Sequence, residues 1–107
     1  MEDYSLARLN MVESQVRPND VTDKRILATM LELPRENFVP AGRRALAYSD
    51  QDVEVKAADG NGPARYLLAP MTVSRMIQAA DIQPGDLVLD IGCGTGYSSA
   101  ILAALAD

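Results

Sequence analysis

The chain has 107 residues, of which 48% are hydrophobic and 23% are charged, so it falls in the ordinary globular range and can form one modest core. Its 15 acidic and 10 basic side chains give a net charge of -5 with no block of Lys or Arg, so we expect no nucleic acid partner. A single cysteine and no histidine exclude an internal disulfide, histidine-based acid-base catalysis and most transition-metal sites.

The N-terminal residues do not resemble a signal peptide, and they are predicted to form a helix. Its first residues, MEDYSLARLN, carry two acids where a signal peptide would carry lysines. No stretch of the chain approaches the roughly 18 apolar residues of a membrane span, so a cytoplasmic location without a membrane partner is expected. Leu9, Val12 and Val16 keep helical spacing, which predicts a helix from about Tyr4 to Val16, ahead of Pro18.

Two more helical segments are expected before residue 50. Thr22 is the predicted N-cap of a second helix, which Pro34 closes. The apolar face of that helix consists of Ile26, Leu27, Met30 and Leu31. A short helical piece is predicted from Pro40 through Ala45.

The next segments predict a strand, a loop and a helix. Apolar and charged residues alternate over 53–57, as in a half-exposed strand, and the sequence DGNGP at 59–63 is typical of a turn or loop. Pro70 suits the first turn of a third helix, since its missing amide proton would have no partner there. The apolar face of this helix consists of Val73, Met76, Ile77 and Ala80, and Met71 and Met76 are both expected to fill the core.

Residues 87–91, LVLDI, follow a strong turn signal and predict a central strand covered on both faces. A last helix is predicted over 97–106. The sequence stops where the next parallel strand would follow, so the chain is expected to be the N-terminal part of a longer protein, with an uncovered apolar face that favours self-association. The predicted fold class is α/β: a helical N-terminal subdomain at 1–50, then the incomplete start of a Rossmann-like domain at 51–107.

The most informative segment is the glycine-rich turn at 92–96, GCGTG, between the predicted strand and the last helix. Glycines permit positive φ and close approach of a ligand, and the N-terminus of the following helix offers free amide protons. A nucleotide or an amino-acid carboxylate could bind there. Two simpler interpretations stay open: the glycines form a plain tight connection, and Asp90 is a helix cap or a solvated strand end.

The spacing of the glycines limits which nucleotide ligands the turn can bind. The dinucleotide fingerprint GxGxxG needs a third glycine where Tyr97 stands, which argues against a nicotinamide-dependent oxidoreductase, and no GK[ST] of a phosphate loop follows. The remaining pattern, VLDIGCGTG, resembles motif I of the class I S-adenosyl-L-methionine-dependent methyltransferases. The resemblance implies that this cofactor binds a set of six residues with its amino group near the acid. These are Asp90, Gly92, Cys93, Gly94, Thr95 and Gly96.

Cys93 is more simply a small turn residue than a nucleophile, because no histidine is available as its base. Thr95 has a simple alternative role as a hydrogen-bonding residue of the turn. No catalytic residue is identified from the sequence, and no metal is expected.

A second resemblance covers most of the chain. Residues 21–40, VTDKRILATMLELPRENFVP, and 45–50, ALAYSD, are similar to the N-terminal segment of protein-L-isoaspartate O-methyltransferases. This implies methyl transfer to the α-carboxylate of an isoaspartyl residue in a damaged protein. The ester then collapses to a succinimide, which can reopen to aspartate, so the activity is protein repair and the partner is an isoaspartyl protein or peptide.

The chain departs from that family at 64–70, which reads ARYLLAP where the family has a sequence close to GQTISQP. Leu68 replaces the serine expected to hold the acceptor carboxylate, Tyr66 replaces the threonine, and whether Tyr66 or Arg65 substitutes for the lost donor is open. Leucine cannot donate a hydrogen bond. The alternative is a methyltransferase-like fold without isoaspartyl activity, with a different acceptor or as a non-catalytic binding module. The 107 residues alone are expected to be inactive, since they lack most of a sheet.

Overall fold

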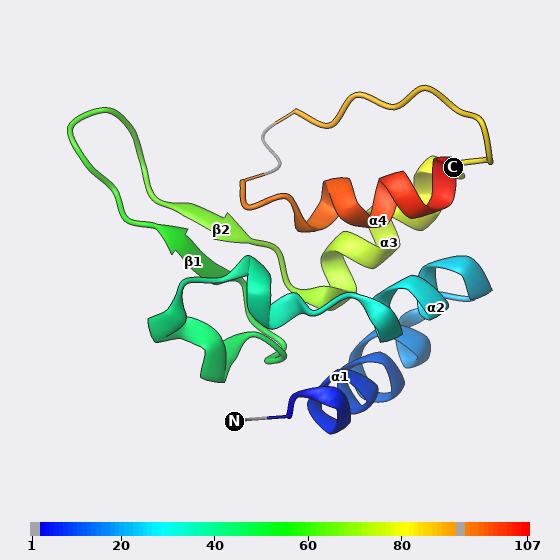
Figure 1. Ribbon diagram of the computed structural model, residues 1–107, viewed down its shortest axis with the longest axis horizontal. Coiled ribbons are helices and arrows are strands. Elements are labelled where there is room, and N and C mark those ends of the chain that lie inside the picture. Colours follow the sequence, from blue (N-terminus) through cyan, green and yellow to red (C-terminus); the bar gives the residue numbers. More distant parts are fainter. Residues whose placement is uncertain (1–2, 92–93) are drawn as a thin grey trace.

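The computed structural model describes residues 3–91 and 94–107 and combines four α-helices with one small sheet (Figure 1). The helices are α1 (Ser5–Met11), α2 (Lys24–Glu32), α3 (Pro70–Ala80) and α4 (Tyr97–Ala106), and the strands are β1 (Val53–Lys56) and β2 (Arg65–Leu67). A π-helical segment (Val12–Val16) and three 3-10 segments (Arg17–Asn19, Arg35–Phe38, Ala41–Leu46) complete the regular structure. The mixed α/β class is confirmed.

The first predicted helix is confirmed as helical, but its type changes along its length. α1 passes into the π-helical segment and then into the 3-10 turn that contains Pro18, before Asp20 ends it at φ 67°. Val12 and Val16 are completely buried, whereas Leu9 is exposed. The hydrophobic spacing therefore predicted the buried face correctly at Val12 and Val16. The α-helix does not continue regularly through this stretch, because Pro18 lacks an amide proton to donate.

The N-cap of α2 is Asp23, so the prediction of Thr22 is wrong by one residue. The Asp23 carboxylate accepts a hydrogen bond from the Arg25 amide at 2.9 Å. The amides of Thr22 and Asp23 both donate to the side-chain oxygen of Gln78, at 2.7 and 2.9 Å, which joins the start of α2 to α3. Thr22 is thus used in a tertiary contact that spacing could not indicate.

The sheet is a two-stranded antiparallel hairpin. Val53 lies opposite Leu67 and Glu54 opposite Tyr66, with an irregularity in register between Glu54 and Lys56. The strand expected at 53–57 and the loop at 59–63 are confirmed, and the loop is closed by the Asp59–Gly62 bridge. β2 was not predicted as a strand because three residues are too few to show an alternation.

One core joins the two halves of the chain. It includes Val12 and Ile26 from the N-terminal helices together with Val73 and Ile101 from α3 and α4, and α2 contacts α4 directly. The predicted helices at 70–80 and 97–106 are both confirmed. Met71 and Met76, however, are 38% and 60% exposed, so the prediction that they fill the core is wrong.

The strand predicted at 87–91 is not formed. These residues run as an extended segment that arches over α4 from its C-terminal to its N-terminal end, and Gly85 N–H donates to the Ala106 carbonyl (Figure 1). Leu87, Leu89 and Ile91 are 103%, 83% and 84% exposed, whereas Val88 and Asp90 are half-buried. The period-two alternation of a strand is present, but no described strand lies alongside to complete the backbone hydrogen bonds that a sheet requires.

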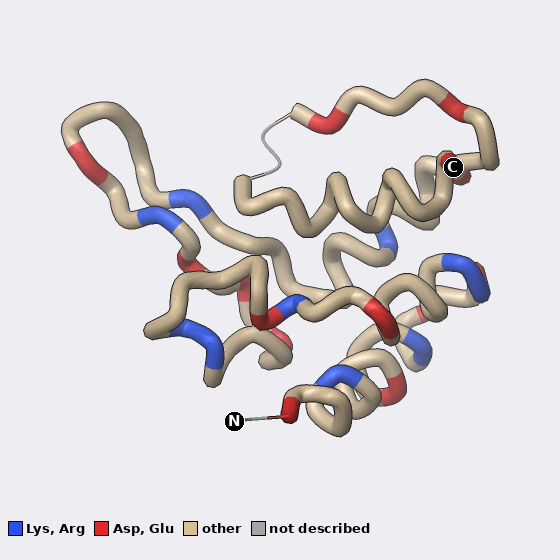
Figure 2. The backbone as a smooth tube through the Cα atoms, in the orientation of Figure 1, with Lys and Arg blue, Asp and Glu red and all other residues tan. Residues whose placement is uncertain are grey.

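Charge is distributed unevenly over the molecule. Figure 2 shows basic and acidic residues mixed over the N-terminal helices and the hairpin, whereas the charged residues of the extended segment that passes over α4 are acidic and α4 itself has none. Among residues 3–91 and 94–107, no helix is long and apolar enough to cross a membrane.

Candidate functional site

Asp90 is held at the start of α4 by two hydroxyl groups. Ser98 Oγ donates to Asp90 Oδ2 at 2.7 Å, and Ser99 Oγ donates to the same oxygen at 3.0 Å. These donors are side-chain hydroxyls and not backbone amides of α4. Asp90 is therefore not the helix cap that was one of the simpler interpretations of this residue. The other carboxylate oxygen, Oδ1, has no hydrogen-bond partner among the described residues. The Oδ2 oxygen is thus fixed by two hydroxyl donors, and no described residue donates to the Oδ1 oxygen.

The glycine turn has the geometry that requires glycine. Gly94 and Gly96 have φ values of 58° and 94°, in the left-handed region that other residues rarely adopt. A Cβ atom built on either glycine would meet nothing within 4 Å, so open space lies beside the backbone. Thr95 between them is exposed. Gly92 and Cys93, the other two residues predicted to bind the cofactor, lie outside the described residues.

The N-terminus of α4 follows this turn directly. Gly96 is the N-cap residue, and no side chain of the described residues caps the first amides of the helix. Free first-turn amides and the helix dipole favour an anionic or carboxylate group at this position. The negative oxygen of Asp90 lies at the same end of α4, so a zwitterionic amino acid could present its ammonium to Asp90 and its carboxylate to these amides.

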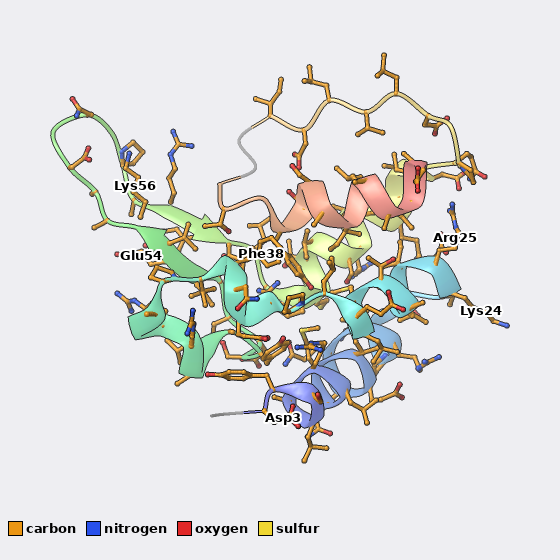
Figure 3. The ribbon with its side chains drawn as sticks, viewed as in Figure 1. Asp3, Lys24, Arg25, Phe38, Glu54 and Lys56 are labelled. Carbon is orange, nitrogen blue, oxygen red and sulfur yellow. The ribbon has the colours of Figure 1, made fainter. Side chains whose placement is uncertain are left out.

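Tyr97 packs the end of the glycine turn against the N-terminal part of the chain. Its side chain is completely buried, its ring lies 4.8 Å from the Arg35 guanidinium carbon, and Phe38 meets it edge-on with 5.3 Å between ring centroids. Figure 3 shows Phe38 beneath the start of α4. Burial raises the pKa of the Tyr97 phenol, an effect that the guanidinium partly offsets. Glycine at this position could make none of these contacts.

Two hollows flank the arch at 87–91. One, of about 370 Å³, has a floor that includes Ser99 and Ala103 of α4. The other, of about 360 Å³, is lined by Leu68, which directly follows β2, by Met76 of α3, and by Asp90. The second hollow therefore brings the predicted acceptor segment and the predicted cofactor acid to one cavity, and it explains why Met76 is exposed.

The three residues considered at the acceptor segment are all on the surface. Tyr66 is 52% exposed and Arg65 is also exposed, and neither side chain forms a hydrogen bond within the described residues. Leu68 is 36% exposed, and its carbonyl accepts a hydrogen bond from Arg35 Nη2 at 2.8 Å. No hydroxyl of this segment is aimed at the cavity beside Asp90.

Three residues of this region, Ser98, Ser99 and Arg35, were not predicted from the sequence. The two serines had a usable signal, because they occupy the first turn of a helix just after a glycine-rich loop. Arg35 had none, since an arginine between Pro34 and Glu36 is indistinguishable from a solvated charge in the sequence. Within the described residues, no group of three His, Cys, Asp or Glu side chains is placed to hold a metal ion.

Comparison with known proteins decides the family. The sequence profile of the protein-L-isoaspartate(D-aspartate) O-methyltransferases matches residues 7–107. The chain belongs to this family. A protein-L-isoaspartate O-methyltransferase of Aeropyrum pernix is 44% identical over 102 residues, which are 95% of this chain and 37% of that protein. The corresponding protein of Koribacter versatilis is 38% identical over 103 residues, 96% of this chain and 44% of its own length.

The fold agrees with the sequence match. A solved structure of a protein-L-isoaspartate O-methyltransferase superimposes with a TM-score of 0.76 at 25% identity, covering 94% of this chain and 31% of that one. The chain therefore spans less than half the length of these relatives. The predicted family and methyltransferase fold are confirmed, while the division at residue 50 and the six cofactor-binding residues stay predictions.

Proposed function

We propose that this chain provides the cofactor turn and part of the acceptor side of an S-adenosyl-L-methionine-dependent O-methyltransferase that acts on L-isoaspartyl residues of damaged proteins. Its two predicted parts, 1–50 and 51–107, would be a helical subdomain and the start of the cofactor-binding domain. The single observation that carries the proposal is the fixed Asp90 carboxylate beside the glycine turn and the uncapped start of α4. A cytoplasmic location and a protein repair role belong to the same proposal.

The residues present fit the cofactor. Asp90 Oδ1 would accept a hydrogen bond from the amino group of the cofactor, and the first amides of α4 would donate to the carboxylate of the cofactor. Gly94 and Gly96 would let the cofactor lie against the backbone beside Thr95, and Gly92 and Cys93 are the two further contacts that the motif implies. S-adenosyl-L-methionine, when bound, supplies a methyl group already activated by the sulfonium charge. The protein's task is then to hold an ionised carboxylate in line with it and exclude water, which needs no histidine.

Titration of the 107-residue chain with S-adenosylhomocysteine tests the proposal, with Asp90→Asn as the variant and Asp50→Asn as the control. Asp50 is exposed and distant in sequence from the turn, so its replacement removes the same charge without touching the site. We expect the affinity to fall at least about tenfold in Asp90→Asn, because a charge-assisted hydrogen bond contributes about 1.5–3 kcal/mol. Equal affinities of the two variants, or a preference for NAD, would contradict the cofactor assignment.

Leu68 favours a second candidate, a methyltransferase of the same fold with a different acceptor or a non-catalytic binding module. A lost hydrogen bond to a carboxylate weakens binding by about 1.5–3 kcal/mol, and no other hydroxyl of 64–70 is aimed at the cavity. The test needs a chain completed to the length of the relatives, because the 107 residues alone are expected to be inactive. Methyl transfer by that longer chain to an isoaspartyl peptide but not to its aspartyl isomer would support the first candidate. Cofactor binding by it without transfer to either peptide would support the second.

We also propose that the exposed side chains of the arch promote self-association. Leu87, Leu89 and Ile91 form one uncovered apolar edge. Exposed apolar edges of extended chain associate readily because they leave both side chains and backbone groups without partners.

A further inference from the structure

Arg35 is the most deeply buried charged residue of the described chain, with a relative exposure of 0%. Its Nε donates to the Ala47 carbonyl at 2.6 Å, and its Nη2 donates to the Leu68 carbonyl at 2.8 Å. Its guanidinium carbon lies 4.8 Å from the centroid of the Tyr97 ring. One side chain thus contacts three segments that are far apart in the sequence.

Two of these contacts are made to opposite sides of the candidate site, the segment 64–70 and the glycine turn. Leu68 belongs to the segment 64–70 and lines the hollow that Asp90 also lines. Tyr97 directly follows Gly96, the last residue of the glycine turn. The guanidinium is planar and its donors have fixed directions, so a displacement of one contact displaces the other.

Arg35 is an expensive residue for a purely structural role. It forms no ion pair among the described residues, and burial lowers the pKa of its guanidinium. Arg35 Nη1 and the Tyr97 hydroxyl oxygen are both buried, and neither has a geometrically acceptable hydrogen-bond partner among the described residues. A well-packed apolar side chain would avoid these desolvation penalties, but it could not hold two carbonyls and an aromatic ring in one fixed arrangement.

We propose that Arg35 is a positioning residue that sets the distance between the acceptor segment, through the Leu68 carbonyl, and the cofactor turn, through the Tyr97 ring. The roles of the two segments rest on the proposed function. The connection between them does not, because it consists of contacts within the chain. Arg35 touches neither the cofactor nor the acceptor and acts only through Leu68 and Tyr97.

The test is a distance measurement on the 107-residue chain without ligand. Spin labels on Tyr66→Cys and Ala104→Cys, both exposed positions, report on β2 and α4 after the native cysteine is replaced by Cys93→Ser. Double electron-electron resonance then compares Arg35→Gln and Arg35→Lys with the unmodified site. Arg8→Gln is the control, since Arg8 also binds two partners from other segments, Tyr48 and Glu36, but contacts neither side of the site.

We expect one narrow distance in the parent chain and in Arg8→Gln, and a shifted or broadened distribution in both Arg35 variants. Lysine keeps the charge, but its single ammonium group cannot reproduce the planar arrangement of donors. Urea is added before freezing so that Arg8→Gln and the Arg35 variants are compared at equal free energies of unfolding. An unchanged distribution in the Arg35 variants would overturn the proposal, and so would equal broadening in Arg8→Gln, which would indicate general loosening.

Hydrogen exchange in the unsubstituted chain keeps the test decisive if neither Arg35 variant folds. The amides of Ala69, bonded to Asp52, and Ala100, bonded to Gly96, lie on the two sides of the connection. If Arg35 joins these sides, both amides open together with one free energy. Independent opening would overturn the proposal. Because no cofactor is added, these results cannot be confused with the S-adenosylhomocysteine titration, which tests the proposed function.

Discussion

α2 and the arch at 87–91 are both apolar segments, yet the structure treats them in opposite ways. Ile26 and Met30 of α2 are completely buried against a core that includes α4, whereas Leu87 and Leu89 of the arch are among the most exposed apolar side chains described. The difference shows that an apolar pattern indicates which side chains need cover but not whether the cover is present. A helix satisfies its own backbone hydrogen bonds, while an extended segment depends on neighbours for both backbone and side chains.

The difference in burial between these two regions is tested most directly by shortening one apolar side chain of the core and one of the arch. We expect Ile101→Ala, which removes a fully buried side chain of α4, to lower the free energy of unfolding by about 2–5 kcal/mol. Leu89→Ala, on the arch, should change it by no more than about 0.5 kcal/mol. Urea unfolding followed by circular dichroism gives both values. Equal losses would show that the arch is covered in solution.

A second prediction concerns the polar contacts that hold the N-terminal region and that the arch lacks. Tyr48 Oη donates to Glu36 Oε1 and accepts from Arg8 Nε at 3.0 Å, while Arg8 also binds Glu36 at 3.2 Å. Burial and the hydrogen bond to Glu36 raise the pKa of Tyr48 to about 12. Because the folded pKa lies above the unfolded value of 10.0, this stabilisation is complete below pH 10 and is lost as the pH rises to about 12.

We therefore expect Tyr48→Phe to lower stability at neutral pH by about 1–3 kcal/mol, because Glu36 and Arg8 each lose a partner in a partly buried site. The variant should also lose less further stability between pH 10 and pH 12 than the parent chain does. Tyr66→Phe is the matched control, since the Tyr66 hydroxyl is exposed and unbonded in the described structure. Unfolding curves measured across this pH range check both, and the same pH slope for Tyr48→Phe and the parent would refute the assignment.

The smallest effect on stability is expected for Leu89→Lys, which changes association instead. Leu89 is 83% exposed, so a charge there should alter the free energy of unfolding by no more than about 0.5 kcal/mol. The lysine should weaken self-association, because a charged side chain on an open edge opposes pairing with another chain. Sedimentation over a range of concentrations measures this. A parent chain that stays monomeric throughout would rule out association through the arch.

Local features of this protein were predictable from its sequence. Pro70 and the spacing of Val73 and Ile77 gave the start and buried face of α3, because these depend on backbone geometry within a single helix. The turn at Gly94 and Gly96 was predictable for the same reason, since left-handed φ values favour glycine. The family could also be predicted, because its motif is contiguous.

Tertiary structure alone decided which groups those elements bring together. The sequence placed Asp90 and Tyr97 seven positions apart, but only the fold turned Asp90 toward Ser98 and buried Tyr97 against Arg35. It also decided that LVLDI stays an extended arch, because a strand exists only where another strand pairs with it. Helix periodicity and turn chemistry are local properties, whereas strand pairing and the burial of Arg35 depend on residues that are distant along the chain.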